Sequence, residues 1–217
     1  MLTLTHAITD IISTDSFLQY GLQYHLLNLT KVAKHMQKHV EVRTKKSVSS
    51  SAILMALSRY QRRLKIFAPR PEQFRVHDLT LRTHVATVSM TKTQKCMQRV
   101  HDFHTEIQKN KGYITITEST GEITLLFDEK HLAAAQKLFG ESITYANAHV
   151  AALALHFPEQ YAAAPGFLCT VLQQLMLQGI NVVEVASTFT EFVLYVDEAN
   201  AKLAFETLYS LFRVKGK

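Results

Sequence analysis

Histidine pairs are the side chains of this sequence whose spacing first suggests metal chemistry. The chain contains 11 histidines, and His35 with His39 and His101 with His104 are spaced to share one face of a helix. Such a pair supplies two ligands, and a zinc site needs at least a third from another segment. No HExxH or CxxC pattern supplies one, so solvated helix positions explain these histidines better than a metal site does.

The two cysteines, Cys96 and Cys169, show no metal or redox spacing, which is typical of free thiols in a reducing cytoplasm. Each stands near the start of a predicted helix, where the helix dipole lowers the pKa of a thiol. Neither has a base that the sequence can assign, so a small core side chain is the alternative interpretation. No nucleophile, base and orienting group can be named together, and we therefore expect no catalytic site and no cofactor.

Basic charge is concentrated near the N-terminus. Residues 1–70 hold 11 Lys or Arg against three Asp or Glu, a balance of +8, whereas the remaining residues carry −2. This asymmetry is typical of a polyanion-binding module joined to another domain. The side chains expected to contact duplex DNA are basic or hydroxyl groups: Lys45, Lys46, Ser50, Ser51, Arg59, Arg62 and Arg63.

Short helices must position these side chains. Apolar residues at helical spacing predict helices around residues 4–12, after Asp15, after Asn28 and from residue 52 to about 64. The last helix is rich in Arg and opens with hydroxyl residues, so the segment resembles a helix-turn-helix or winged-helix module. No two-strand wing follows Arg63. A helical dimerisation or adaptor domain with an incidental basic face is the alternative, and two prolines within residues 68–71 predict a linker after it.

Beyond residue 75 strands alternate with helices, and one pattern occurs twice. In the later copy, an apolar strand at 149–157 precedes a helix through residues 169–176, a strand at 181–185 and a turn from Ser187. A strand at 191–196 then ends at Asp197-Glu198, which opens a helix. The earlier copy repeats the turn at Ser119, the strand and the acidic start at Asp128-Glu129. Chance alternation rarely reproduces all three features together.

The run Pro165-Gly166-Phe167-Leu168, followed by Gly179-Ile180-Asn181-Val182, Ser187-Thr188 and Val196-Asp197-Glu198, resembles an ACT domain. It is similar to the tandem ACT region at the C-terminus of aspartate kinases. The resemblance covers residues 148–214 well and residues 75–140 more weakly. It implies a ferredoxin-like βαββαβ fold for each unit, pairing of two units side by side, and an amino-acid effector at their interface.

The same resemblance implies ligand contacts from the loop before the first helix, from that helix's start and from the second strand: Pro165, Gly166, Phe167 and Leu168, with Asn181 and Val182 opposite. Gly166 lets a ligand approach the backbone closely, and free N–H groups at a helix start suit a carboxylate. The Asn181 amide can both donate and accept. Alternatively, Pro165 and Gly166 merely begin a helix. The earlier copy has no Gly at residues 89–93, so we expect one site per chain or a purely structural first copy.

The sequence therefore predicts an α+β chain with a helix-turn-helix-like helical domain at 1–68, a degenerate ACT-like domain at 75–145 and an ACT domain at 146–217. We expect a cytoplasmic, non-enzymatic, homodimeric regulator in which an amino-acid effector alters DNA binding. The alternative is a regulatory or adaptor subunit that senses an amino acid and acts on a protein partner without nucleic acid. No secretory signal or membrane span is expected.

Overall fold

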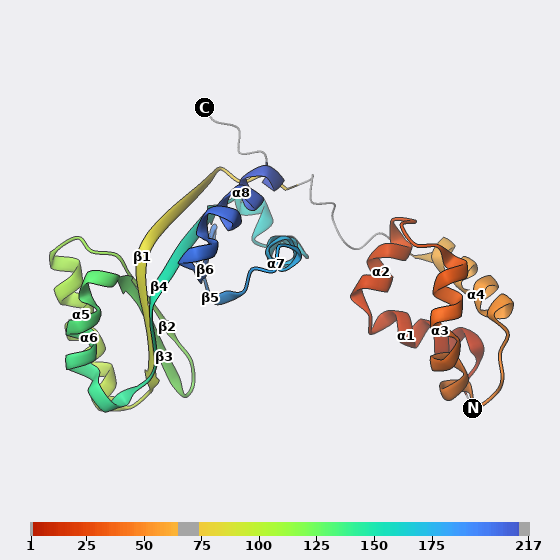
Figure 1. Ribbon diagram of the computed structural model, residues 1–217, viewed down its shortest axis with the longest axis horizontal. Coiled ribbons are helices and arrows are strands. Elements are labelled where there is room, and N and C mark those ends of the chain that lie inside the picture. Colours follow the sequence, from red (N-terminus) through yellow and green to blue (C-terminus); the bar gives the residue numbers. More distant parts are fainter. Residues whose placement is uncertain (1, 65–73, 213–217) are drawn as a thin grey trace. The chain divides into compact units, whose positions relative to one another are not determined.

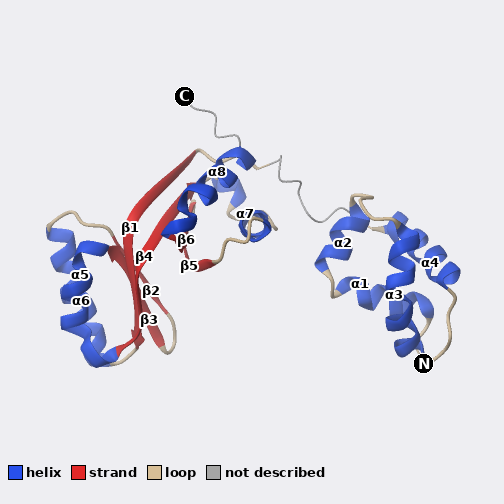
Figure 2. Ribbon diagram, in the orientation of Figure 1, coloured by secondary structure: helices blue, strands red, loops and turns tan. Residues whose placement is uncertain are grey.

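The computed structural model describes residues 2–64 and 74–212, which belong to two units, Met1–Pro69 and Arg70–Lys217 (Figures 1 and 2). The predicted linker at residues 68–71 lies outside the described residues. Each unit has a hydrophobic core of its own. None of the described helices is long and apolar enough to cross a membrane.

Four helices make up the described part of the N-terminal unit: α1 (Leu4–Ser13), α2 (Ser16–Gln23), α3 (Leu29–Thr44) and α4 (Ser50–Arg63). Each begins at a side chain that accepts a hydrogen bond from the first turn, namely Thr3, Asp15, Asn28 and Ser49. These caps satisfy N–H groups that have no partner within the helix. The four helices bury a shared core that includes Ile8, Leu22, Met36 and Leu57. Residues 2–64 contain no strand, so a wing is not part of this described segment.

The C-terminal unit is built on one antiparallel six-stranded sheet with the strand order β2-β3-β1-β4-β6-β5. Two 14-residue strands, β1 (Asp78–Thr91) and β4 (Ile143–His156), pair along its centre. Beyond β1 lie β3 (Glu122–Asp128) and β2 (Ile114–Glu118). Beyond β4 lie β6 (Glu191–Asp197) and β5 (Val182–Ser187).

Each central strand serves both halves of the sheet. The later part of β1, from Val85, pairs with β3, whereas its first part, 78–82, pairs with the end of β4. The first copy (residues 84–142) therefore receives its fourth strand from the start of β4, and the second copy (residues 149–212) from the start of β1. The boundary expected at 145/146 falls inside β4, so the copies share strands instead of following one another. His84-Val85-Ala86 and His149-Val150-Ala151 occupy corresponding positions, and Val85 is the Cα partner of Val150.

Helices α5 (Gln94–Lys109) and α6 (Leu132–Phe139) pack on the first half, and α7 (Phe167–Leu177) and α8 (Ala201–Phe212) pack on the second (Figure 1). Phe103, Phe127 and Phe139 form the aromatic centre of the first core. Phe157 and Phe167 lie at the centre of the second. Full burial of one such side chain contributes about 1.5–3 kcal/mol.

A smaller cluster lies on the side of the strands that faces away from these helices: Val85, Leu126, Val150, Ala152 and Tyr195. These residues alternate along their strands with residues of the two helix-covered cores. The hydroxyl of Tyr195 is 2.6 Å from that of Tyr113, which directly precedes β2. Because β3, β1 and β4 separate β2 from β6 in the strand order, the sheet must curl strongly to bring the two hydroxyls together.

Candidate functional site

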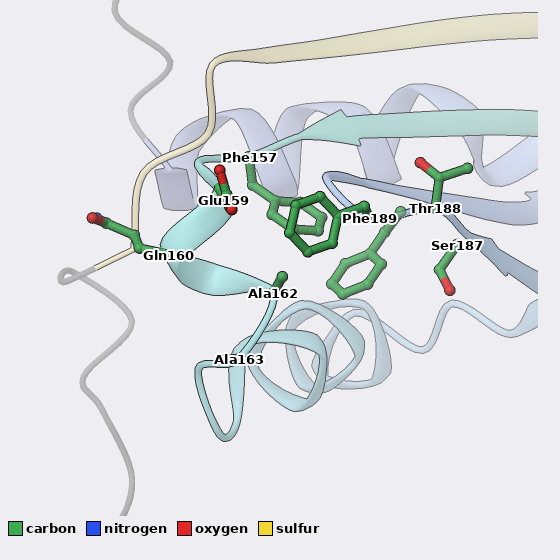
Figure 3. A pocket seen from close by; sticks show the side chains of 9 residues that line it. Phe157, Glu159, Gln160, Ala162, Ala163, Ser187, Thr188 and Phe189 are labelled. Atoms are coloured by element: carbon green, nitrogen blue, oxygen red, sulfur yellow. The ribbon is translucent and has the colours of Figure 1, made fainter.

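An open hollow of about 790 Å³ lies at one end of the second copy (Figure 3). One wall is the connection between β4 and α7, and the other is the turn between β5 and β6. The residues that line it are Phe157, Glu159, Gln160, Ala162, Ala163, Ser187, Thr188, Phe189 and Phe192. Figure 3 shows Gln160 and Ala163 on one side, Ser187 and Thr188 on the other, and aromatic rings between them.

Backbone hydrogen bonds and a buried aromatic cluster hold the two walls in place. The N–H of Phe157 donates to the carbonyl of Thr190 at 3.0 Å, which ties the loop to the turn. The ring centroid of Phe167 lies 4.9 Å from that of Phe157 and 5.5 Å from that of Phe192. The loop is therefore anchored to the core at both of its ends.

The lining combines aromatic surface with polar groups that are not used for folding. No hydrogen bond or ion pair among the described residues engages the side chains of Glu159, Ser187 or Thr188. Phe189 is 65% exposed although it is a large aromatic residue. Ligand sites are typically apolar hollows with a few polar groups that fix orientation. This hollow suits a small molecule with one cationic group and one apolar part.

Pro165 and Gly166 lie exposed at the end of this loop, directly before α7. Gly166 has φ 87°, in the left-handed region, and its carbonyl accepts from the N–H of Thr170 at 2.8 Å. Glycine adopts this conformation without the steric cost that a Cβ brings. Phe167 is only 1% exposed, and Leu168 is half-buried against the same core. Both side chains anchor the helix, and the Phe167 ring is closed to a ligand.

Asn181 and Val182 lie at the other end of α7. That helix has 11 residues and so rises about 16 Å between the loop and this end. Val182 pairs with Val196, whereas Ser187 pairs with Phe192 beside the loop. Within one chain the structure therefore does not bring Asn181 and Val182 to Gly166. The physical reason is strand direction: β4 and β5 are parallel, because each is antiparallel to β6, so the end of β5 meets the loop.

The turn that forms the second wall of the hollow, Ser187 to Phe189, was predicted from the sequence as a turn but not as part of a site. Strand direction also predicts its proximity to the loop. When a helix connects two parallel strands, the C-terminal ends of both strands lie at the same edge of the sheet. Within one chain the end of β5, and not its start, therefore borders the loop, and a role for Asn181 and Val182 at an interface between units stays a prediction.

The residues expected to contact DNA lie in the connection that precedes α4 and on α4 itself. Lys45, Lys46, Ser50 and Ser51 lie near its start, and Arg59, Arg62 and Arg63 lie near its end. All are exposed except Ser50, which is half-buried. The 14 residues of α4 extend over about 20 Å, so the structure does not gather the two groups at one point. Within the second group, the three Arg are within one turn of one another.

Each acidic side chain of the described N-terminal unit has a partner in the protein. Asp10 pairs with Arg43 at 3.4 Å, Asp15 caps α2, and Glu41 accepts the N–H of Val48 at 3.1 Å. The exposed Arg near the end of α4 therefore have no acidic partner among residues 2–64.

No protein-family model matches this chain, and no curated protein matches it in sequence. Solved structures do match it. The aspartokinase α and β subunits align with a TM-score of 0.52 and 12% identity, over 64% of this chain and 99% of that chain. The ligand-free regulatory subunit of aspartate kinase from Thermus thermophilus aligns with a TM-score of 0.52 and 10% identity, over 63% and 98%.

Clostridium acetobutylicum aspartate kinase, described as an allosteric enzyme, aligns with a TM-score of 0.51 and 11% identity, over 69% of this chain and 36% of that chain. At such identities the likeness concerns the fold alone. It confirms the ferredoxin-like, ACT-like fold that the sequence predicted, while the division into two exact ACT units and the helix-turn-helix character of residues 1–68 stay predictions. The chain therefore carries the ACT-type fold found in the regulatory subunit of aspartate kinase.

Proposed function

We propose that the chain is a non-enzymatic regulatory protein whose C-terminal unit binds a free amino acid. The observation that carries the proposal is the hollow between the β4–α7 loop and the β5–β6 turn, with its uncommitted carboxylate and exposed aromatic ring. Two of the similar structures support a regulatory role, because one is a regulatory subunit and the other an allosteric enzyme. In the first copy the corresponding connection is only Lys92-Thr93, so we expect one site per chain.

The lining residues match the groups of an amino acid with an apolar side chain. The Glu159 carboxylate can accept from the ammonium group, and the hydroxyls of Ser187 and Thr188 can donate to the carboxylate. Phe189 and Phe192 offer apolar surface to the side chain. Pro165 and Gly166 fix the backbone conformation where the loop enters α7. Asn181 and Val182 contribute only if a second chain of the expected homodimer brings its own β5 start over the loop.

A thermal-shift screen of the 20 amino acids against the full chain tests this proposal. A ligand specific to the folded state raises Tm in proportion to the logarithm of its concentration above Kd. We expect one or a few apolar amino acids to do so, and Glu159→Gln and Phe189→Ala to reduce the shift. Glu122→Gln, which changes an exposed carboxylate in the β2–β3 hairpin of the first copy, is the control and should keep the full shift. No shift with any amino acid at about 10 mM would contradict the proposal.

A second candidate function, duplex DNA binding by the N-terminal unit, is favoured by the exposed Arg59, Arg62 and Arg63 and by acidic side chains of the unit that pair elsewhere. Phosphate contacts of such residues release counterions and give binding a steep salt dependence. In this form of the proposal, the effector changes the distance between the N-terminal units of the two chains in a homodimer. The alternative remains an adaptor subunit that acts on a protein partner.

Binding of fluorescent duplex DNA at several salt concentrations separates these two candidates. Arg62→Ala/Arg63→Ala should weaken binding and lower the salt slope by about one for each lost phosphate contact. Lys137→Ala, an exposed basic residue of α6, serves as the control and should leave both unchanged. No binding of the unaltered chain at low salt would favour the adaptor.

A further inference from the structure

Three side chains that can bind metal ions converge where the two copies meet: His84, Glu129 and Glu198. One ligand atom from each lies within 4.8 Å of the others. His84 stands in the irregular part of β1, between the pairs Arg82 with Ala152 and Val85 with Val150. Glu129 and Glu198 directly follow β3 and β6 and begin corresponding 3-10 turns.

The sheet register explains why these segments meet. Asp128 pairs with Val85, Val85 with Val150, and Val150 with Asp197, which forms one row across four strands. Glu129 and Glu198 directly follow the end residues of this row, Asp128 and Asp197. His84 directly precedes Val85, one of the row's two central residues. The repeated Asp-Glu turn thus supplies one carboxylate from each copy, on either side of the central strand pair.

We propose that His84, Glu129 and Glu198 bind one divalent transition-metal ion, for which Zn²⁺ is the probe. Imidazole favours zinc and similar ions over Mg²⁺ and Ca²⁺, whereas carboxylates accept both kinds. Three protein ligands with solvent access leave a coordination position for water. His84 is exposed and the glutamates are partly buried, so an ion can reach the cluster from solvent.

The distances suit an ion better than direct hydrogen bonds. His84 Nδ1 is 3.5 Å from Glu129 Oε2 and 3.6 Å from Glu198 Oε1. A charge-assisted hydrogen bond is about 2.7–2.9 Å long. Around a tetrahedral zinc ion with bonds of about 2.0–2.2 Å, neighbouring ligand atoms are about 3.3–3.6 Å apart. The two nitrogen–oxygen distances therefore match two edges of such a site, and the third pair of ligand atoms, the two carboxylate oxygens, lies within 4.8 Å.

The charges around the cluster also favour a cation. Among residues 2–64 and 74–212, no Lys or Arg forms an ion pair with Glu129 or Glu198, and His84 is the basic group beside both. Two carboxylates this close repel each other. His84 holds φ 55°, a left-handed conformation that costs a non-glycine residue about 1–2 kcal/mol. His149, its counterpart in β4, is not part of the cluster.

The ion would connect Glu129 of the first copy to Glu198 of the second through β1. It lies apart from the hollow, because residues 150–156 of β4 extend over about 20 Å between the two places. This proposal therefore does not depend on amino-acid binding.

The test is a Zn²⁺ titration of the tag-free full chain by calorimetry, with His84→Ala, Glu129→Gln and Glu198→Gln as variants. We expect one strong site per chain, weakened at least about tenfold in each variant, since even losing a group that only supports a metal ligand costs about 10–100-fold in affinity. His149→Ala is the matched control in the same sheet, and His35→Ala/His39→Ala removes the exposed pair on α3. Both controls should keep the site.

Melting temperatures supply a second readout, in which adding Zn²⁺ reverses the order of the unaltered chain and the Glu variants. Without metal, Glu129→Gln and Glu198→Gln should melt at the same or a higher temperature than the unaltered chain, because one of two repelling charges is gone. With Zn²⁺ the order should reverse, because only the unaltered chain gains the full stabilisation. Zinc binding that survives His84→Ala, or that disappears with His35→Ala/His39→Ala, would overturn the proposal. So would Mg²⁺ binding with equal strength, since it needs no imidazole.

Discussion

The two copies of the C-terminal unit share one strand order but differ in the connection that leads into their first helix. In the first copy β1 ends at Thr91 and α5 begins at Gln94, and the side chain of Thr93 accepts the N–H of Cys96. In the second copy residues 157–166 intervene, and Gly166 precedes α7 without a side-chain cap. The comparison teaches that the sheet fixes the place of the helix, while the connection decides whether its start is closed or borders a hollow.

The largest expected effect comes from the aromatic anchor of each copy. Phe167→Ala and Phe103→Ala should each lower the free energy of unfolding by about 3–5 kcal/mol, because both remove a buried ring and leave a cavity. Phe189→Ala, at the exposed turn, should stay within about 0.5 kcal/mol. Urea unfolding followed by circular dichroism measures all three. Since the copies share β1 and β4, each anchor variant should lose both copies in one transition. A separate early transition of the second copy in Phe167→Ala would contradict strand sharing.

The connection itself is tested by a pair of glycines. Gly166→Ala should cost about 1–2 kcal/mol, because φ 87° is unfavourable for any residue with a Cβ. Gly121→Ala, in the β2–β3 turn of the first copy, meets no atom within 4 Å and has no positive φ. It should be neutral or stabilise by a few tenths of a kcal/mol, since alanine restricts the unfolded chain. Equal costs at both positions would mean that Gly166 is not conformationally required.

Local features of the fold could be predicted from the sequence. Asp15 and Asn28 cap the helices they were expected to begin, because a cap depends only on residues within one turn. The two Asp-Glu starts and the turns at Ser119 and Ser187 also lie where the pattern placed them. Each of these features is decided within a few residues, which is why the repeat was visible without coordinates.

Features that depend on distant pairing were not predictable in this way. The first part of β1 pairs with the end of β4, seventy or more residues away, and no local pattern indicates this. The same holds for the contact between Tyr113 and Tyr195 and for the cluster of His84 with Glu198. Asn181 is a different case: the direction of β5 places it at the far end of α7 from Gly166 within one chain, so its expected role at an interface between units stays a prediction.

A smaller effect is expected from the hydroxyl pair that joins the copies across the sheet. Tyr195→Phe should cost about 1 kcal/mol, the usual net value of one hydrogen bond. Burial raises the pKa of Tyr195 far above its ordinary value, and the Tyr113 hydroxyl adds to this. Above about pH 10 the unfolded chain releases this proton while the folded chain keeps it, so stability falls as pH rises. The difference between the unaltered chain and Tyr195→Phe should therefore shrink and then reverse in alkaline solution. A difference that is constant with pH would contradict this.

The smallest effect concerns the two thiols, which occupy corresponding helices and should differ in reactivity without any change in stability. Cys96 is 3% exposed, and burial raises the pKa of its thiol above the ordinary value, against a smaller lowering by the nearby Arg99 charge. Cys169 is exposed on α7. Because the thiolate is the reactive form and must reach the reagent, a disulfide reagent such as DTNB should modify Cys169 rapidly in the native protein and Cys96 only on unfolding. Cys169→Ser should abolish the fast phase and Cys96→Ser should leave it intact. Equal native rates for the two thiols would show that the start of α5 opens as readily as that of α7, and the closed cap at Thr93 would then not distinguish the copies.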